Sequence, residues 1–124
     1  MMSFTEEKMD SPVFFKKYDN GTLSLNIGDF DSTILVSREN LLNDDNAIKQ
    51  IEDISTEHLD IVLATNPEII IIGTGKTQQI PQIFILSYLA SKSRTADFMN
   101  SNSACKTFNL LANENRRVCA IIIP

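Results

Sequence analysis

Four consecutive isoleucines at residues 69–72 limit the possible folds of this chain more than any other feature. A strand with one face in water alternates apolar and polar residues, whereas this run has no polar side. Because isoleucine is branched at Cβ, a helix is also disfavoured here. The run therefore predicts a central strand that other layers cover on both faces, and it ends at the turn sequence Gly73-Thr74-Gly75.

A second run, residues 118–123, is apolar on both sides and predicts another central strand. Between the two runs, Pro81 suits the first position of a helix that reaches about Ser91. This helix is expected to bury four side chains: Phe84, Ile85, Tyr88 and Leu89. Residues 95–99 then predict a short strand.

The next helix is expected to be capped by Ser101 or Asn102, because short polar side chains favour that position. Its apolar residues recur at helical spacing and share one face: Ala104, Cys105, Phe108, Leu111 and Ala112. Strand, helix, strand, helix and strand in succession indicate an α/β architecture, a C-terminal βαβαβ unit on a mixed central sheet.

The N-terminal third predicts a β-hairpin. Asn20-Gly21 is a strong turn signal, residues 22–27 alternate polar and apolar side chains, and Gly28-Asp29 is expected to turn the chain into a second strand at 32–37. Residues 41–54 fit either a third strand or an irregular helix. From Thr56, expected as an N-cap, a helix extends to Asn66-Pro67.

Length and charge limit the organisation and the partners. With 124 residues the chain has room for one domain, which we place at residues 14–124 behind a flexible leader at 1–13. Eleven basic and sixteen acidic residues give a net charge of −5, which disfavours nucleic acid and anionic membranes unless a local basic cluster overrides it. The sequence has no signal peptide and no apolar run near the roughly 20 residues of a membrane span, so we expect a cytoplasmic location.

The turn after the isoleucine run contains the G-K-T tail of a phosphate-binding loop. That motif needs a glycine five residues before Gly75, where this chain has Ile70, so a glycine turn that closes a strand is the simpler interpretation. A weaker possibility is an anion or partner site, because ligands gather where strands end and helices begin. It would combine two segments at one sheet edge with nearby cations: Gly73, Thr74, Gly75, Lys76, Asn100, Ser101 and Lys106.

The remaining chemically active residues have simple structural interpretations. His58, the single histidine, is expected to be a solvated residue in a first helical turn rather than a general base. Cys105 and Cys119 are expected to be reduced core thiols. Arg116 and Arg117 either cap a helix C-terminus or present guanidinium groups to a partner. We expect no metal and no cofactor, and the chain lacks a recognisable catalytic set.

The C-terminal half resembles a known family, and Asn20-Gly21 and the segment around Ile34 match its looser N-terminal half. The matching motifs, in order, are PEIIIIGTG at 67–75, Pro81, MNS at 99–101, ACKTFNLL at 104–111 and ENRRV at 114–118. They resemble the small Mth-type domain, also called the adipogenesis-associated domain. Family members commonly have Met-Asp-Thr at 99–101 and tyrosine at Phe108, so this chain lacks an acid and a hydroxyl found there.

The resemblance implies a three-layer α/β domain without an established activity. The family includes a mitochondrial respiratory complex I assembly factor, which implies a non-enzymatic role in protein interaction or assembly of a membrane complex. The partners would then be proteins, with no nucleic acid and no inserted membrane segment, and a homo-oligomer is compatible with this role. The alternative is a small-anion-binding protein or an unrecognised enzyme that uses residues 73–76 and 100–102.

Overall fold

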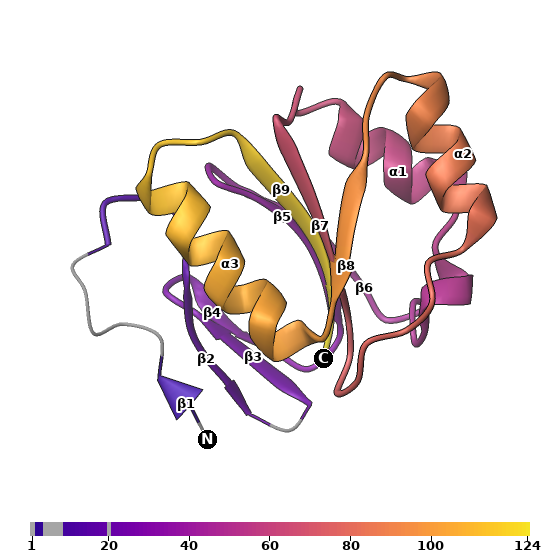
Figure 1. Cartoon of the computed structure of the whole chain (residues 1–124). Helices are drawn as coiled ribbons and strands as arrows, with labels where there is room; N and C mark the ends of the chain where they lie inside the picture. The colour runs from indigo at the N-terminus through magenta and orange to yellow at the C-terminus, as the bar shows by residue number, and fades with distance from the viewer. Residues whose placement is uncertain (1, 4–8, 20) are drawn as a thin grey trace.

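A computed structural model describes the chain except for residues 1, 4–8 and 20. Its centre is a mixed five-stranded sheet with the order β6-β5-β9-β7-β8 (Figure 1). The two apolar runs form β7 (Ile69–Thr74) and β9 (Val118–Ile123), which pair in parallel inside the sheet, as predicted. Next to them, β8 (Ala96–Met99) is parallel to β7, and β5 (Thr33–Ser37) is antiparallel to β9.

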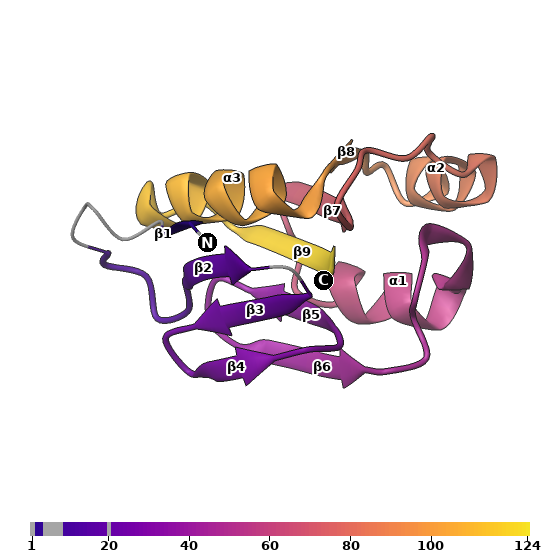
Figure 2. The same cartoon turned by 90° about the horizontal axis from the view of Figure 1, so that it is seen from below.

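Each face of this sheet is covered, as the isoleucine run requires. Ile70 and Ile72 lie in a core beneath α1 (Thr56–Leu63) and α2 (Ile83–Ser91). Ile71 points to the other face and lies in the core beneath α3 (Ser101–Asn113) and a second, smaller sheet. Figure 2 shows α3 with the small sheet on one side of the molecule and α1 with α2 on the other. The predicted three-layer α/β fold is confirmed.

The small sheet is antiparallel, with the order β1-β2-β3-β4, and it contains an N-terminal β-hairpin. Its strands are β1 (Met2–Ser3), β2 (Phe15–Asp19), β3 (Thr22–Leu25) and β4 (Gly28–Phe30). The pairing register of β2 with β3 shifts between Phe15 and Lys17. Asn109 of α3 serves the backbone of Phe15, where its Oδ1 accepts from the Phe15 N–H (2.8 Å) and its Nδ2 donates to the Phe15 carbonyl (2.7 Å). This amide joins the small sheet to α3.

The predicted partner strand of this hairpin is wrong. Residues 32–37 do not pair with 22–27, because β3 pairs with β2 and β4, while β5 enters the large sheet. All five residues of β5 are buried, so this strand needs covered faces, which the small sheet does not offer. The turn lies at Asn26-Ile27, and Gly28-Asp29 already belongs to β4. The predicted Asn20-Gly21 turn includes Asn20, which lies outside the described residues.

Several predicted boundaries also need correction. The open segment 41–54 contains both alternatives, the edge strand β6 (Leu41–Asp45) and the short 3-10 helix η1 (Ile51–Asp53). The N-cap of α1 is Ser55, where Thr56 was predicted, and the N-cap of α3 is Asn100, where Ser101 or Asn102 was predicted. The helix α2 is capped by Gln82, so it begins after Pro81 and not at it. On α2, Ile85 and Leu89 are buried as predicted, whereas Tyr88 is half-buried and Phe84 is exposed.

The expected flexible leader, residues 1–13, stays a prediction because part of it lies outside the described residues. Within the described part, the backbone of Met2–Ser3 pairs with Tyr18 and Lys17. Val13 is buried, and its N–H donates to the carbonyl of Arg38 (3.2 Å).

Replacing Asn109 by alanine is expected to lower the free energy of unfolding by about 2–4 kcal/mol. Two buried backbone groups of Phe15 lose their partner, and each such loss costs about 1–3 kcal/mol. Urea unfolding measures the change. The matched control is Leu110→Ala, at an exposed neighbouring position of α3, with an expected change within about 0.5 kcal/mol. Equal losses in the two variants would show that the Asn109 amide does not join the layers.

Candidate functional site

The structure brings together the two strand ends that the sequence placed at one edge. Because Gly73 pairs with Met99 in the parallel β7–β8 ladder, the turn after β7 lies against the start of α3. Gly75 and Ser101 exchange two hydrogen bonds, from the Gly75 N–H to Ser101 Oγ and from the Ser101 N–H to the Gly75 carbonyl, both 2.8 Å long. The Ser101 hydroxyl also donates to the carbonyl of Ile123. Ser101 therefore connects the ends of β7 and β9 from a fully buried position.

Glycine is required at position 73 by the close approach of α3. A Cβ at this position would lie 2.9 Å from Ser101 Oγ and 3.0 Å from Ala104 Cβ, closer than side chains pack. The hydroxyl of Thr74 is used nearby, on the carbonyls of Thr77 (2.6 Å) and Met99 (3.2 Å). The turn after β7 is thus shaped by packing against α3.

The N–H groups that would hold an anion at this edge are largely occupied. Asn100 Oδ1 accepts from the Ser103 N–H (2.9 Å), and the Asn100 carbonyl accepts from the Ala104 N–H. Of the two predicted cations, Lys76 is exposed on the turn and Lys106 is exposed farther along α3. The anion role of this edge stays a prediction, and its hydrogen bonds show a structural role.

Arg116 and Arg117 lie at the opposite end of the sheet from Lys76. They precede β9, where Val118 pairs with Ile69, whereas Gly73 pairs with Ile122, four residues or roughly 13 Å away. The Arg117 N–H donates to Glu68 Oε1 (3.0 Å), and Arg116 Nε lies 3.4 Å from Glu68 Oε2. This backbone N–H, assisted by the two guanidinium groups, holds the pKa of Glu68 below its usual value. The predicted site residues therefore divide into two separate groups.

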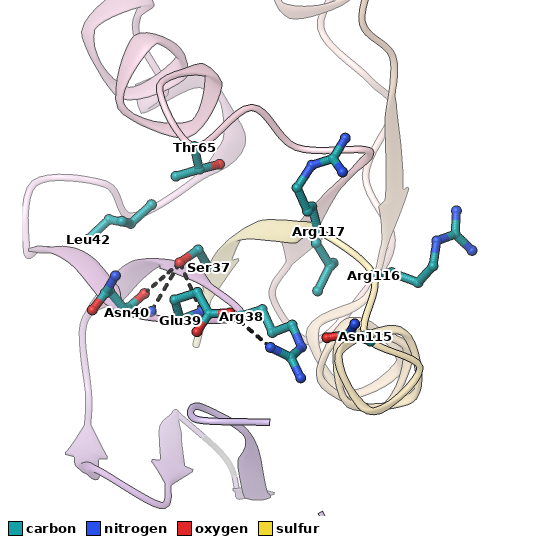
Figure 3. Close-up of a pocket in the computed structure, with 10 residues that line it drawn as sticks. Ser37, Arg38, Glu39, Asn40, Leu42, Thr65, Asn115, Arg116 and Arg117 are labelled. Carbon is teal, nitrogen blue, oxygen red and sulfur yellow. Dashed lines mark hydrogen bonds and ion pairs between the residues drawn. The ribbon is translucent and has the colours of Figure 1, made fainter. Parts of the chain in front are cut away.

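Arg116 and Arg117 border a cavity of about 520 Å³ that the sequence analysis missed (Figure 3). Its lining comes from the end of β5, the start of β6, the end of α1 and the start of β9: Ser37, Arg38, Glu39, Asn40, Leu42, Thr65, Asn115, Arg116, Arg117 and Val118. The lining holds three arginines and the carboxylate of Glu39, and Glu68 lies against Arg116 and Arg117, so the site is net positive in a chain of net charge −5. The available signal was the polar sequence Arg38-Glu39-Asn40 directly after a buried strand.

Two of the three arginines of this cavity are held by backbone carbonyls. Arg38 Nε donates to the Ala112 carbonyl (2.8 Å), and Arg117 Nε donates to the Asn66 carbonyl (2.9 Å). The Arg117 side chain is nevertheless 60% exposed. In Figure 3 the guanidinium groups of Arg38, Arg116 and Arg117 point in three different directions. They are arranged around the cavity and do not converge on one point.

The prediction of a solvated His58 is wrong. Its Nδ1 lies 2.9 Å from the Ser55 N–H and 3.1 Å from Ser55 Oγ, and its Nε2 lies 2.7 Å from Asp45 Oδ2. Serine, histidine and aspartate are also the residues of a serine-protease triad. Here, however, Nδ1 of His58 accepts a hydrogen bond from the backbone N–H of Ser55, so it is not available as a base for the Ser55 hydroxyl. Ser55 Oγ in turn caps α1 by accepting from the His58 backbone. The group therefore joins α1 to β6.

Both cysteines are free and buried, so the prediction of reduced core thiols is confirmed. Burial raises the pKa of Cys119 to about 11 and that of Cys105 further, which leaves both as unreactive thiols near neutral pH. Among the residues that the structure describes, no three His, Cys, Asp or Glu side chains gather as metal ligands. In this same part of the chain, no helix has the length and apolar character needed to cross a membrane.

The hydrogen bonds of Asp45 predict a pH dependence of the stability. The Ala47 N–H and the His58 side chain lower the pKa of Asp45, so its stabilising effect is complete above about pH 4 and is lost as the pH falls through the lowered pKa. Asp45→Asn is expected to lower stability at pH 7 and to flatten the loss of stability below pH 4. Urea unfolding across this pH range measures both effects.

Asp97→Asn is the control for this experiment, because Asp97 is an exposed carboxylate of β8. The loss of stability of Asp97→Asn below pH 4 is expected to stay closer to that of the wild-type chain. An identical loss of stability below pH 4 in Asp45→Asn and the wild-type chain would contradict the stabilising role of the Asp45–His58 contact.

Comparisons with known proteins identify the family and the relatives of this chain. A profile of the family described as "Protein of unknown function (DUF498/DUF598)" matches residues 15–123. The chain is 48% identical over 123 residues to the "13 kDa major membrane protein" of Francisella tularensis subsp. holarctica, covering 99% of this chain and 100% of that protein. It is 31% identical over 74 residues to NADH dehydrogenase (ubiquinone) 1 alpha subcomplex assembly factor 3 of Danio rerio, over 58% of this chain and 42% of that protein.

A solved structure from Bordetella pertussis, described as a Mth938-like domain, superimposes with a TM-score of 0.77 at 19% identity. The superposition covers 99% of this chain and 92% of that domain. At this identity the likeness concerns the fold alone. It confirms the Mth-type fold that the sequence motifs indicated.

Proposed function

We propose that this chain, which belongs to the family of proteins of unknown function DUF498/DUF598, is a non-enzymatic assembly protein whose cavity beside Arg117 binds an acidic segment of a protein partner. The observation that carries the proposal is the positive cavity at the start of β9. Three arginines gather there on the surface of an acidic chain. Two carboxylates pair with them, Glu39 with Arg38 and Glu68 with both Arg116 and Arg117, so the group keeps a net positive charge. Opposite charges at an interface select partners and speed their association.

The arrangement of these arginines favours an extended partner over a small anion. A small anion needs donors that converge on one point, whereas these guanidinium groups lie around the cavity and point apart (Figure 3). The carbonyl contacts of Arg38 and Arg117 fix the side chains before binding, which lowers the entropy lost on association. Arginine is also among the residues enriched at interface centres.

The relatives support an assembly role at a membrane complex. One relative is named an assembly factor of NADH dehydrogenase, and another is named a major membrane protein. We extend both descriptions to this chain as part of the proposal: it acts on the cytoplasmic side of a membrane, on subunits of a respiratory or other membrane complex. Its partners are then proteins.

The alternative is a small-anion-binding protein or an enzyme that uses residues 73–76 and 100–102. The hydrogen bonds of Gly75, Asn100 and Ser101 give it less support, because these groups bind one another across the strand ends. Stabilisation of the purified chain by phosphate or a carboxylate in a thermal-unfolding screen would favour this alternative.

Arg117→Ala is expected to lose partner binding while the fold is kept. The wild-type chain is used to capture proteins from an extract of its source, and captured subunits are quantified by mass spectrometry. Removing an exposed guanidinium at an interface is expected to reduce their recovery at least about fivefold, and added salt is expected to reduce wild-type recovery in the same direction.

The matched control is Lys49→Ala, which removes one exposed positive charge at a position outside the cavity. It is expected to capture the same subunits as the wild-type chain. Unfolding of Arg117→Ala would show that Arg117 is a structural residue. A folded Arg117→Ala chain with undiminished recovery would contradict the role of the cavity.

A further inference from the structure

The helix α2 exposes large apolar side chains and carries no charged residue along its length, IFILSYLAS. Ile83 is 80% exposed, Phe84 46% and Leu86 41%, and Ile80 in the preceding loop is 84% exposed. These are four of the six large apolar side chains that are exposed in the described part of the chain, and they fall within seven residues. Clustered apolar exposure of this kind marks an interaction surface.

The inner face of α2 does not explain these residues. Ile85 and Leu89 are fully buried in the core on the α1 side and attach the helix to the domain. At 100° per residue, Ile83 lies on the side of the helix away from this pair, and Phe84 and Leu86 lie on its two flanks. Both views of the molecule show α2 as an outermost element (Figures 1 and 2). The helix therefore exposes large apolar side chains beyond its packed side, and its exposed polar residues are the uncharged Ser87 and Ser91.

The charge of this segment is opposite to that of the whole chain. Residues 69–96 contain no aspartate or glutamate, and they contain three cations, Lys76, Lys92 and Arg94. Arg94 is turned to the base of the domain, where it donates to the Pro67 carbonyl and to Asn66 Oδ1. The exposed Lys76 and Lys92 lie before and after α2, and Lys92 Nζ is 5.6 Å from the centre of the Tyr88 ring.

We propose that the outer face of α2, formed by Ile80, Ile83, Phe84 and Leu86 between Lys76 and Lys92, is a docking surface for a bilayer that contains anionic phospholipid. The apolar side chains enter the boundary between headgroups and acyl chains, and the two lysines contact lipid phosphates. Helices that lie in this interface combine exposed apolar residues with flanking basic residues in the same way. Here the rest of the domain supplies the polar side that faces water.

Charge favours a lipid surface over a second copy of the chain. In a two-fold dimer the same surface patch of both copies meets, so Lys76 and Lys92 of one copy would face a patch that carries positive charge only. The carboxylate of Asp60 accepts from the Tyr88 hydroxyl and belongs to α1. An anionic bilayer supplies both the negative charge and the apolar interior that this face requires.

This inference goes beyond the proposed function, because it concerns a lipid surface at α2 rather than a protein partner at the Arg117 cavity. The test uses the purified full chain and sedimentation with vesicles of phosphatidylcholine, with or without phosphatidylglycerol. The wild-type chain is expected to bind the mixed vesicles and to bind phosphatidylcholine alone much more weakly. Replacing Lys76 or Lys92 by glutamine is expected to weaken binding to mixed vesicles about fivefold for each lysine, because each cation near an anionic surface contributes about that factor.

Ile83→Asp is expected to weaken binding to the mixed vesicles at least tenfold. Leu110→Asp is the matched control, because it places the same charge at an exposed leucine of α3 and is expected to bind like the wild-type chain. Thermal unfolding of each variant confirms that it is folded. Absence of wild-type binding to mixed vesicles, or equal weakening by Ile83→Asp and Leu110→Asp, would overturn the proposal. Equal binding to both kinds of vesicle would also overturn it.

Light scattering at the same protein concentration tests the competing possibility that a second copy of the chain covers the outer face of α2. A wild-type dimer that Ile83→Asp converts to a monomer, together with no vesicle binding, would show that α2 binds a second copy and that the lipid proposal is wrong. Arg117→Ala is expected to bind vesicles normally. Failure of vesicle binding therefore leaves the cavity proposal standing, and failure of partner capture leaves the lipid proposal standing.

Discussion

The parallel pairing of β7 with β9 joins two strands that have no polar side. Each of them must be covered on both faces, and this requirement arranges the remaining elements into layers. On one face, α3 approaches β7 so closely that residue 73 has no space for a side chain. The same approach positions the Ser101 hydroxyl between Gly75 and Ile123, where it connects the ends of the two strands. The turn that carries a G-K-T sequence is therefore determined by packing of the central strands.

The other face of the pair explains the unusual composition of α2. Ile85 and Leu89 are the α2 residues that are fully buried on that side, where they cover the sheet together with Leu59 and Val62 of α1. Ile83 is 80% exposed and adds little to this core, and Phe84 and Leu86 expose a large part of their side chains beside it. An apolar outer face that folding does not require is evidence of binding. The positive cavity beside Arg117 is separate from this face and uses loops at the start of β9.

Local sequence patterns predicted the elements well and their partners poorly. Residues 69–72 and 118–123 predicted central strands because an apolar strand without a polar side has few other solutions. The partner of residues 32–37 was missed because pairing of β5 with β9 depends on residues more than 80 positions away. On α2, periodicity gave Phe84 as buried, since a helix that is apolar all round does not indicate which side faces the core. The cavity was missed because Arg38 and Arg117 are far apart in the sequence and line one cavity only after the sheet has formed.

The most direct test of whether the outer face of α2 binds an anionic bilayer is hydrogen–deuterium exchange. It is measured on the full chain with and without vesicles of phosphatidylcholine and phosphatidylglycerol. The account predicts slower exchange in peptides covering residues 76–92, because the loop and the helix contact the bilayer there. Exchange in peptides covering residues 33–40 and 114–118 is predicted to stay unchanged. Slower exchange at residues 114–118 without a change at 76–92 would contradict the account, and so would the absence of any difference between the two conditions.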